Sequence, residues 1–208
     1  HEYHVKQKEA LQHLKSGRNT LVIFATGRGK SAVFQTMAAY LSLVKKQASI
    51  IIYPLRSLVN DQQQHLKQKM SLLGVSVAAV NGSMNMQEKK DFFVKLGQGE
   101  IDVVLTTPEF LEFHLDKFKC LTGRLGLFVV DEAHHLAQAK RSGYRLLGRI
   151  WGSLGKPLSL AVTATADDEA AQRIVNILEC EEVVVEEHVR GNLSLVDRRE
   201  EKDKLAYL

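Results

Sequence analysis

The chain has 208 residues, of which 45% are hydrophobic and 25% charged, and its formal net charge is +4. That length suits one large domain with a full core, and the composition is ordinary for a soluble globular protein. The two cysteines, Cys120 and Cys180, lie far apart without a metal-ligand spacing, which excludes a disulfide framework and a structural zinc site and favours a reducing compartment.

The hydropathy pattern also argues against a membrane protein. No apolar run approaches the roughly 18 residues that a membrane span needs, and no basic-then-apolar signal segment opens the chain. The chain starts at His1 rather than Met, so we expect it to be a piece of a longer protein. Its mild positive charge is compatible with a polyanionic partner, although many unrelated proteins share it.

Seven short segments rich in apolar and β-branched residues are predicted strands. They are Thr20–Phe24, Ser49–Tyr53, Val75–Val80, Ile101–Leu105, Leu125–Val130, Leu158–Val162 and Val183–Val185. Several are almost continuously apolar, as in strands that are covered on both faces of a parallel sheet.

Amphipathic segments with helical spacing separate these strands. One buried stripe comprises Phe34, Met37, Ala38 and Leu41, and a second comprises Ala171, Ile174, Val175 and Leu178. Alternation of strands and helices along the whole chain predicts an α/β fold with a mostly parallel central sheet.

The first strand leads into a glycine-rich segment and then a helix. The segment is Ala25-Thr26-Gly27-Arg28-Gly29-Lys30-Ser31. Glycines let backbone N–H groups turn around a phosphate, and a helix N-terminus adds partial positive charge. We expect residues Thr26 to Ser31 to bind a nucleotide, with Lys30 at the β- and γ-phosphates and Ser31 on Mg²⁺. The strict template has glycine where this chain has Phe24.

Two acidic residues follow the fifth strand, in the sequence Asp131-Glu132-Ala133-His134. Ligands collect at the carboxyl ends of parallel strands, where adjacent carboxylates need a compensating cation such as Mg²⁺. We expect Asp131 to help hold Mg²⁺ and Glu132 to orient and deprotonate the attacking water. Lys30, Asp131, Glu132 and His134 form the predicted catalytic group.

These two sites and their surroundings resemble the RecQ family of superfamily 2 DNA helicases, from about Tyr3 to Asn192. The resemblance implies a three-layer RecA-like P-loop NTPase domain at residues 1–193. Residues 194–208 would be a charged exit segment toward a second motor domain. Gln7 resembles the glutamine with which the family reads adenine, a task that suits an amide because it offers a donor and an acceptor.

Two further strand ends resemble the family's nucleic-acid-binding motifs. The segment Tyr53 to Gln62 resembles motif Ia, and Leu105 to Glu109 resembles motif Ib. The resemblance places nucleic acid at these residues: Leu55, Arg56, Ser57, Thr106, Thr107, Pro108 and Glu109. Loops with hydroxyls, N–H groups and a cation hold a phosphodiester backbone without reading its sequence.

Three residues are expected to couple nucleotide state to nucleic-acid binding. Thr163 and Thr165 belong to a segment that resembles motif III. Gln138 belongs to the loop after the acidic motif, which is aromatic-rich in the family. Here Ala139 stands at the tryptophan position, and the loop is one residue longer. His4 also replaces the arginine that is more usual near the adenine-reading glutamine.

The resemblance therefore predicts an ATP-dependent DNA helicase, acting 3′ to 5′ in DNA repair or recombination, with ATP and Mg²⁺ as cofactors. Its partners would be single-stranded DNA or a duplex junction and a second RecA-like domain of the same chain. We expect a cytoplasmic location, at the nucleoid if the source is bacterial. The isolated domain should bind ATP but hydrolyse it poorly, because an arginine from the second domain normally completes the site.

Two alternatives remain open from the sequence. The chain could belong to an RNA helicase or a double-strand DNA translocase, since backbone-gripping loops do not distinguish these substrates. It could also be a nucleotide-gated nucleic-acid-binding module without catalysis, although that class is expected to lose Lys30, Asp131 or Glu132.

Overall fold

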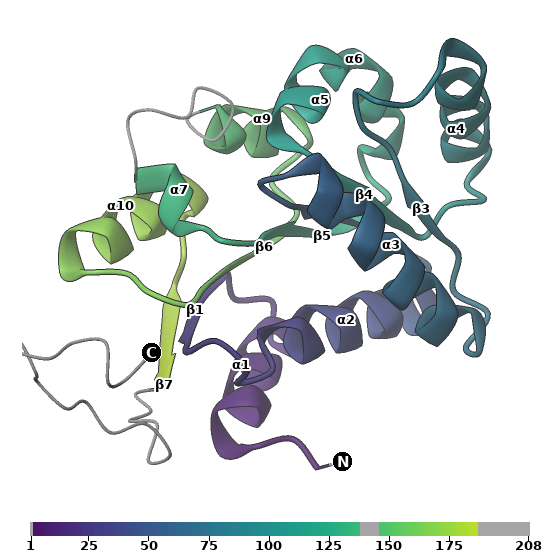
Figure 1. Cartoon of the computed structure of the whole chain (residues 1–208). Helices are drawn as coiled ribbons and strands as arrows, with labels where there is room; N and C mark the ends of the chain where they lie inside the picture. Colours follow the sequence, from purple (N-terminus) through teal and green to yellow (C-terminus); the bar gives the residue numbers. More distant parts are fainter. Residues whose placement is uncertain (1, 138–145, 187–208) are drawn as a thin grey trace, which may run out of the picture.

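A computed structural model describes residues 2–137 and 146–186 (Figure 1). Seven strands form one sheet in the order β3-β4-β2-β5-β6-β1-β7. Their bounds are β1 Thr20–Phe24, β2 Ala48–Ile52, β3 Val77–Ala79, β4 Val103–Thr106, β5 Leu125–Val130, β6 Leu158–Thr163 and β7 Glu182–Glu186. Every strand pair in this sheet is parallel, which confirms the predicted α/β class.

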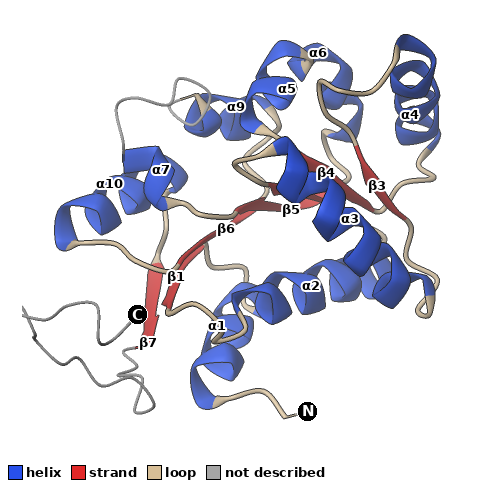
Figure 2. Cartoon of the chain, in the orientation of Figure 1, coloured by secondary structure: helices blue, strands red, loops and turns tan. Residues whose placement is uncertain are grey.

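Helices cover both faces of the sheet, so the domain has three layers (Figure 2). The helices are α1 Val5–Lys15, α2 Lys30–Tyr40, α3 Arg56–Ser71, α4 Met86–Gln98, α5 Pro108–Phe113, α6 Leu115–Phe118, α7 His134–Ala137, α9 Leu147–Ser153 and α10 Asp168–Leu178. A π-helical turn, Leu41–Lys45, extends α2, and a 3₁₀ turn, Lys119–Leu121, follows α6.

Each face of the sheet buries its own apolar core. On one face, α1, α2 and α3 pack on the sheet through residues such as Leu14, Phe34 and Leu66. On the other face, α4, α5, α9 and α10 pack through residues such as Phe92 and Trp151. Burial on both faces explains why β2, β4 and β5 consist almost entirely of apolar residues.

Strands β3 and β4 both begin two residues later than their apolar runs predict, and side-chain hydrogen bonds join the residues just before them. The Ser76 N–H donates to the Asp102 carboxylate (2.8 Å), and the Asp102 N–H donates to the Ser76 hydroxyl (2.9 Å). These bonds join the two chain segments just before β3 and β4 begin, beside backbone bonds from the Asp102 and Val103 N–H groups to the Ser76 carbonyl oxygen. The predicted boundary at residue 193 and the exit segment lie outside the described residues.

Two further findings concern membrane-spanning helices and clusters of metal-binding side chains. Within residues 2–137 and 146–186, none of the helices is both long enough and apolar enough to span a bilayer. The same ranges hold no group of three or more His, Cys, Asp or Glu side chains arranged to bind a metal ion.

The two cysteines differ in burial, which predicts different reactivity. Burial raises the pKa of Cys180 to about 12, whereas Cys120 is exposed. Because the thiolate is the reactive form, we expect a maleimide reagent to modify Cys120 in the native protein and Cys180 only after denaturation. Mass spectrometry of labelled peptides measures this directly. Equal labelling rates in the native protein would contradict the packing of Cys180 beneath α10.

Candidate active site

The glycine-rich segment turns sharply between β1 and α2. Gly27 and Gly29 have φ angles of +82° and +72°, which side chains other than glycine adopt only with strain. A Cβ atom at Gly29 would collide with the amide nitrogen of Gln7. The turn delivers the chain to Lys30 at the N-terminus of α2, where the first N–H groups have no intrahelical acceptor.

Gln7 supports this turn from α1. Its amide nitrogen donates to the carbonyl oxygens of Arg28 (3.3 Å) and Gly29 (3.2 Å), and its amide oxygen accepts from the His4 N–H (3.0 Å). Gln7 is buried, and both hydrogens of its amide group are used by the loop. Gln7 therefore links α1 to the glycine-rich turn. This structural role is separate from the contact with adenine that the sequence predicts.

Arg28 points away from the turn and toward the last residue of β7. Its guanidinium pairs with the Glu186 carboxylate, and His4 Nδ1 lies 3.6 Å from the same carboxylate. The guanidinium charge of Arg28 is thus paired with a carboxylate, and the nucleotide contact expected of Arg28 stays a prediction. The pairing follows from the sheet order, which places β7 directly beside β1.

Lys30 and Asp131 face one another at the carboxyl edge of the sheet. The Lys30 ammonium donates to the Phe24 carbonyl oxygen (3.1 Å). Burial raises the pKa of Asp131 to about 6, although the Glu132 N–H bond and the charge of Lys30 act in the opposite direction. A half-buried carboxylate whose pKa is raised by loss of solvent is well suited to bind a cation.

Glu132 adopts an unusual backbone conformation at the end of β5. Its φ angle is +48°, in the left-handed region that costs a non-glycine residue about 1–2 kcal/mol. Its N–H donates to an Asp131 carboxylate oxygen at 3.0 Å. Strain of this kind clusters at functional sites, where the surrounding structure fixes the side chain.

The segment after β6 contacts the acidic motif. Because β6 lies between β5 and β1, Thr163 ends its strand between Asp131 and the phosphate loop. The Thr163 hydroxyl donates to the Thr165 carbonyl oxygen (2.9 Å), so it must accept from His134 Nδ1, at 3.1 Å. His134 Nδ1 also lies 3.3 Å from the Glu132 carboxylate.

These contacts connect Thr163 and Thr165, two of the residues expected to couple nucleotide state to nucleic-acid binding, with His134 of the acidic motif. His134 and Thr165 line a cavity of about 1030 Å³ between α7, α10, β1 and β7. The third expected coupling residue, Gln138, lies outside the described residues, as do Ala139 and the rest of its loop.

The residues expected to bind nucleic acid divide into two groups. Leu55, Arg56, Ser57 and Glu109 are exposed at the N-termini of α3 and α5. Thr106, Thr107 and Pro108 are buried. The Thr106 hydroxyl donates to the Val80 carbonyl oxygen (2.9 Å), and the Thr107 hydroxyl caps α5 by accepting from the Phe110 N–H. Thr106 and Pro108 are thus buried in the structure, and their predicted contact with nucleic acid stays a prediction.

Tyr53 lies at the site but was not predicted to belong to it. Its register on β2 matches that of Asp131 on β5, since Ile52 pairs with Val130. Tyr53 is buried, and its hydroxyl has no hydrogen-bond partner among the described residues. Burial and the charge of Asp131 raise its pKa. An aromatic residue at a strand end gives no sequence signal for such a position.

The sequence matches the DEAD/DEAH box helicase family over residues 4–174. It is 33% identical to the probable ATP-dependent DNA helicase RecS of Bacillus subtilis, over 86% of this chain and 35% of that protein. It is 31% identical to the ATP-dependent DNA helicase RecQ of Synechocystis sp., over 81% of this chain and 36% of that protein.

The fold is also similar to that of the DUF1998 helicase MrfA, solved bound to DNA. The TM-score is 0.72 at 17% identity, and the match covers 88% of this chain and 27% of that one. At this identity the likeness concerns the fold alone.

Replacement of Gly29 tests the turn and its support by Gln7. We expect Gly29→Ala to destabilise the protein by at least about 1–2 kcal/mol, because alanine is strained at positive φ and its Cβ displaces Gln7. Urea denaturation measures the change. Gly97→Ala is the matched control, because Gly97 lies in α4 with open space around it, and alanine there should stabilise by about 0.5–1 kcal/mol. Equal effects of the two substitutions would exclude a constrained turn.

Proposed function

Because this chain belongs to the DEAD/DEAH box helicase family, we propose that it is the ATP-binding motor domain of a RecQ-like, ATP-dependent DNA helicase. The observation that carries the proposal is the juxtaposition of Lys30 at the start of α2 with the half-buried carboxylate of Asp131. Lys30 places a cation at the glycine-rich turn, and Asp131 places beside it a carboxylate that could bind a metal ion.

The residues present fit a nucleotide triphosphate with Mg²⁺. The turn at Gly27 and Gly29 exposes backbone N–H groups, and Lys30 can exchange its bond to the Phe24 carbonyl for a phosphate. Ser31 and Asp131 would hold Mg²⁺, which when bound neutralises charge on the phosphates. Glu132, next to Asp131, is the base that would orient and deprotonate the attacking water.

The contact of His134 with Thr163 supports a coupling role for the segment after β6. A change at Glu132 or His134 during hydrolysis would be transmitted through the Thr163 hydroxyl to Thr165. Thr165 lies at the cavity beside α10. We propose that this chain of bonds links nucleotide state to the grip on nucleic acid.

The chain covers 35% and 36% of the two relatives' own lengths, so the activity of the whole protein belongs to the proposal. We propose that a second RecA-like domain supplies the arginine that completes hydrolysis. The whole protein would unwind DNA 3′ to 5′ in repair or recombination, in the cytoplasm or at the nucleoid. The isolated chain would bind ATP but hydrolyse it slowly.

Titration of a fluorescent ATP analogue with Mg²⁺ tests the site. We expect saturable binding to the 208-residue chain and a loss of at least tenfold in affinity for Lys30→Ala, because the phosphates lose their cation. Lys67→Gln, on the exposed side of α3, is the control and should bind as the wild type does. A folded wild-type chain that does not bind, or one with fast DNA-stimulated turnover, would refute the corresponding part of the proposal.

A further inference from the structure

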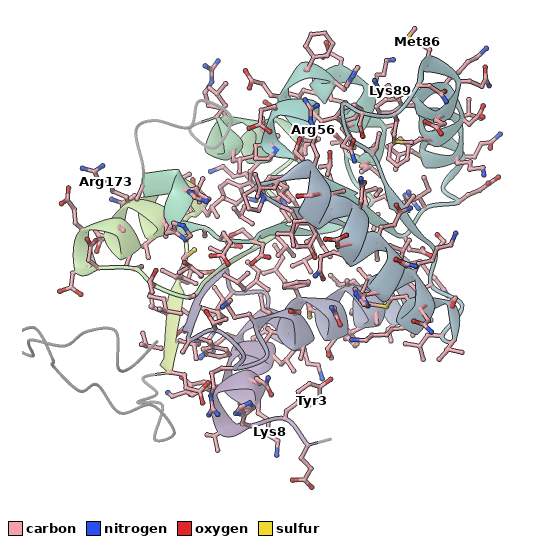
Figure 3. All side chains as sticks on the ribbon, viewed as in Figure 1. Tyr3, Lys8, Arg56, Met86, Lys89 and Arg173 are labelled. Carbon is pink, nitrogen blue, oxygen red and sulfur yellow. The ribbon has the colours of Figure 1, made fainter. Side chains whose placement is uncertain are left out.

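A second pocket, of about 320 Å³, lies between the N-terminus of α3, α4 and α5. It is lined by Arg56, Gly82, Lys89, Thr107, Glu109, Phe110, Phe113 and His114. Arg56 belongs to the segment that resembles motif Ia, but Lys89, Phe113 and His114 belong to no motif found in the sequence. Figure 3 shows Arg56 and Lys89 on the same side of the molecule, with Met86 farther out on α4.

The two cations of the pocket have no acidic partner. Within the part of the chain that the structure describes, neither Arg56 nor Lys89 has a carboxylate at ion-pairing distance. Lys89 donates to the Gly82 carbonyl oxygen (3.3 Å). Arg56 lies against Gly82, where a Cβ atom would be 2.9 Å from its guanidinium nitrogen. Because Gly82 has no side chain, the Arg56 guanidinium and the Lys89 ammonium can both face the pocket.

An aromatic ring stands exposed at the pocket's edge. Phe113 is 83% exposed, which is unusual for so large an apolar side chain. Its ring meets the edge of His114, at a centroid distance of 4.9 Å and an interplanar angle of 85°. His114 in turn packs on Phe110, which is buried in the core, at 4.3 Å. Phe113 therefore contacts His114 through one ring edge, while most of its ring surface is open to solvent.

The charge of the pocket favours an anion attached to a flat ring. Burial, followed by the charges of Lys117 and Lys89, lowers the pKa of His114, so this ring is neutral at neutral pH. Glu109 is the one carboxylate lining the pocket, against the two cations. A carboxylate repels a phosphate but accepts hydrogen bonds from the amino groups of bases, so it suits the base side of a nucleotide.

We propose that this pocket is a single-nucleotide subsite for single-stranded DNA, in which Phe113 stacks on a base while Arg56 and Lys89 hold the adjoining phosphate. The inference rests on the proposed function, because it assumes that the chain binds nucleic acid. The subsite adds a contact with a base to the contacts with the phosphodiester backbone, since an aromatic ring stacks on the π face of any base.

Binding of a labelled oligothymidylate of about 12 nucleotides, within the site sizes of single-strand-binding proteins, tests the subsite by fluorescence anisotropy. We expect Phe113→Leu to weaken binding roughly tenfold, the change produced by losing a stack worth about 1.4 kcal/mol. Phe113→Trp keeps a flat ring and should bind at least as well as the wild type. An abasic strand of the same length should bind wild type and Phe113→Leu equally, because it offers no base.

The phosphate contact has its own measurement. Lys89→Gln should reduce the slope of log affinity against log salt by about 0.7, the value for one phosphate of a single strand. Lys67→Gln, on the exposed face of α3, should leave both affinity and slope unchanged. An oligouridylate of the same length reports whether RNA also enters the pocket, and tighter binding of RNA than of DNA would overturn the assignment to DNA.

Failure of the subsite is distinguishable from failure of the proposed function. Unchanged binding of oligothymidylate to Phe113→Leu would overturn the subsite and indicate that the exposed ring serves another contact. Wild-type chain that binds the ATP analogue in a Lys30-dependent way but binds no oligothymidylate at low salt would also overturn it. Loss of both ATP and DNA binding in the folded wild type would refute the proposed function itself.

Discussion

The half-buried carboxylate of Asp131, which lies next to Lys30, makes the interaction on which the rest of the site depends. Burial disfavours the charged form of Asp131, and one ammonium and one backbone N–H oppose that effect only in part. The site therefore has a place for additional positive charge. The parallel sheet produces this arrangement, because every strand ends at the same edge and β5 and β1 are separated only by β6.

The neighbours of this pair hold it from two sides. Gln7 bonds to the two carbonyl groups of the phosphate turn and fixes the turn on α1. His134 and Thr163 bond across the ends of β5 and β6 and fix the strained segment at Glu132. A turn and an acidic motif that are each held by side chains from another element are preorganised, so the nucleotide that we propose would bind with little reorganisation. In that proposal, the same bonds would carry changes in nucleotide state to the surface of the domain.

The sequence predicts the fold and the central residues of the site because both depend on local patterns. Apolar runs identify all seven strands, and the glycine turn and the Asp131-Glu132 pair follow strands directly. Features that depend on packing between distant elements were not predictable. Arg28 pairs with Glu186 because β7 lies beside β1, and Thr106 and Pro108 are buried where β4 leads into α5. Tyr53 is buried and Phe113 is exposed, and no local sequence pattern encodes this difference.

The dependence of nucleotide affinity on Mg²⁺ tests the account most directly. Isothermal titration calorimetry with a non-hydrolysable ATP analogue, with and without Mg²⁺, would compare the wild-type chain with Asp131→Asn, which keeps the side chain's shape but removes its charge. We expect Mg²⁺ to tighten binding to the wild type at least tenfold, and we expect Asp131→Asn to abolish this gain while retaining metal-free binding. An equal gain from Mg²⁺ in both proteins would contradict the assignment of Asp131 as the carboxylate that holds the metal.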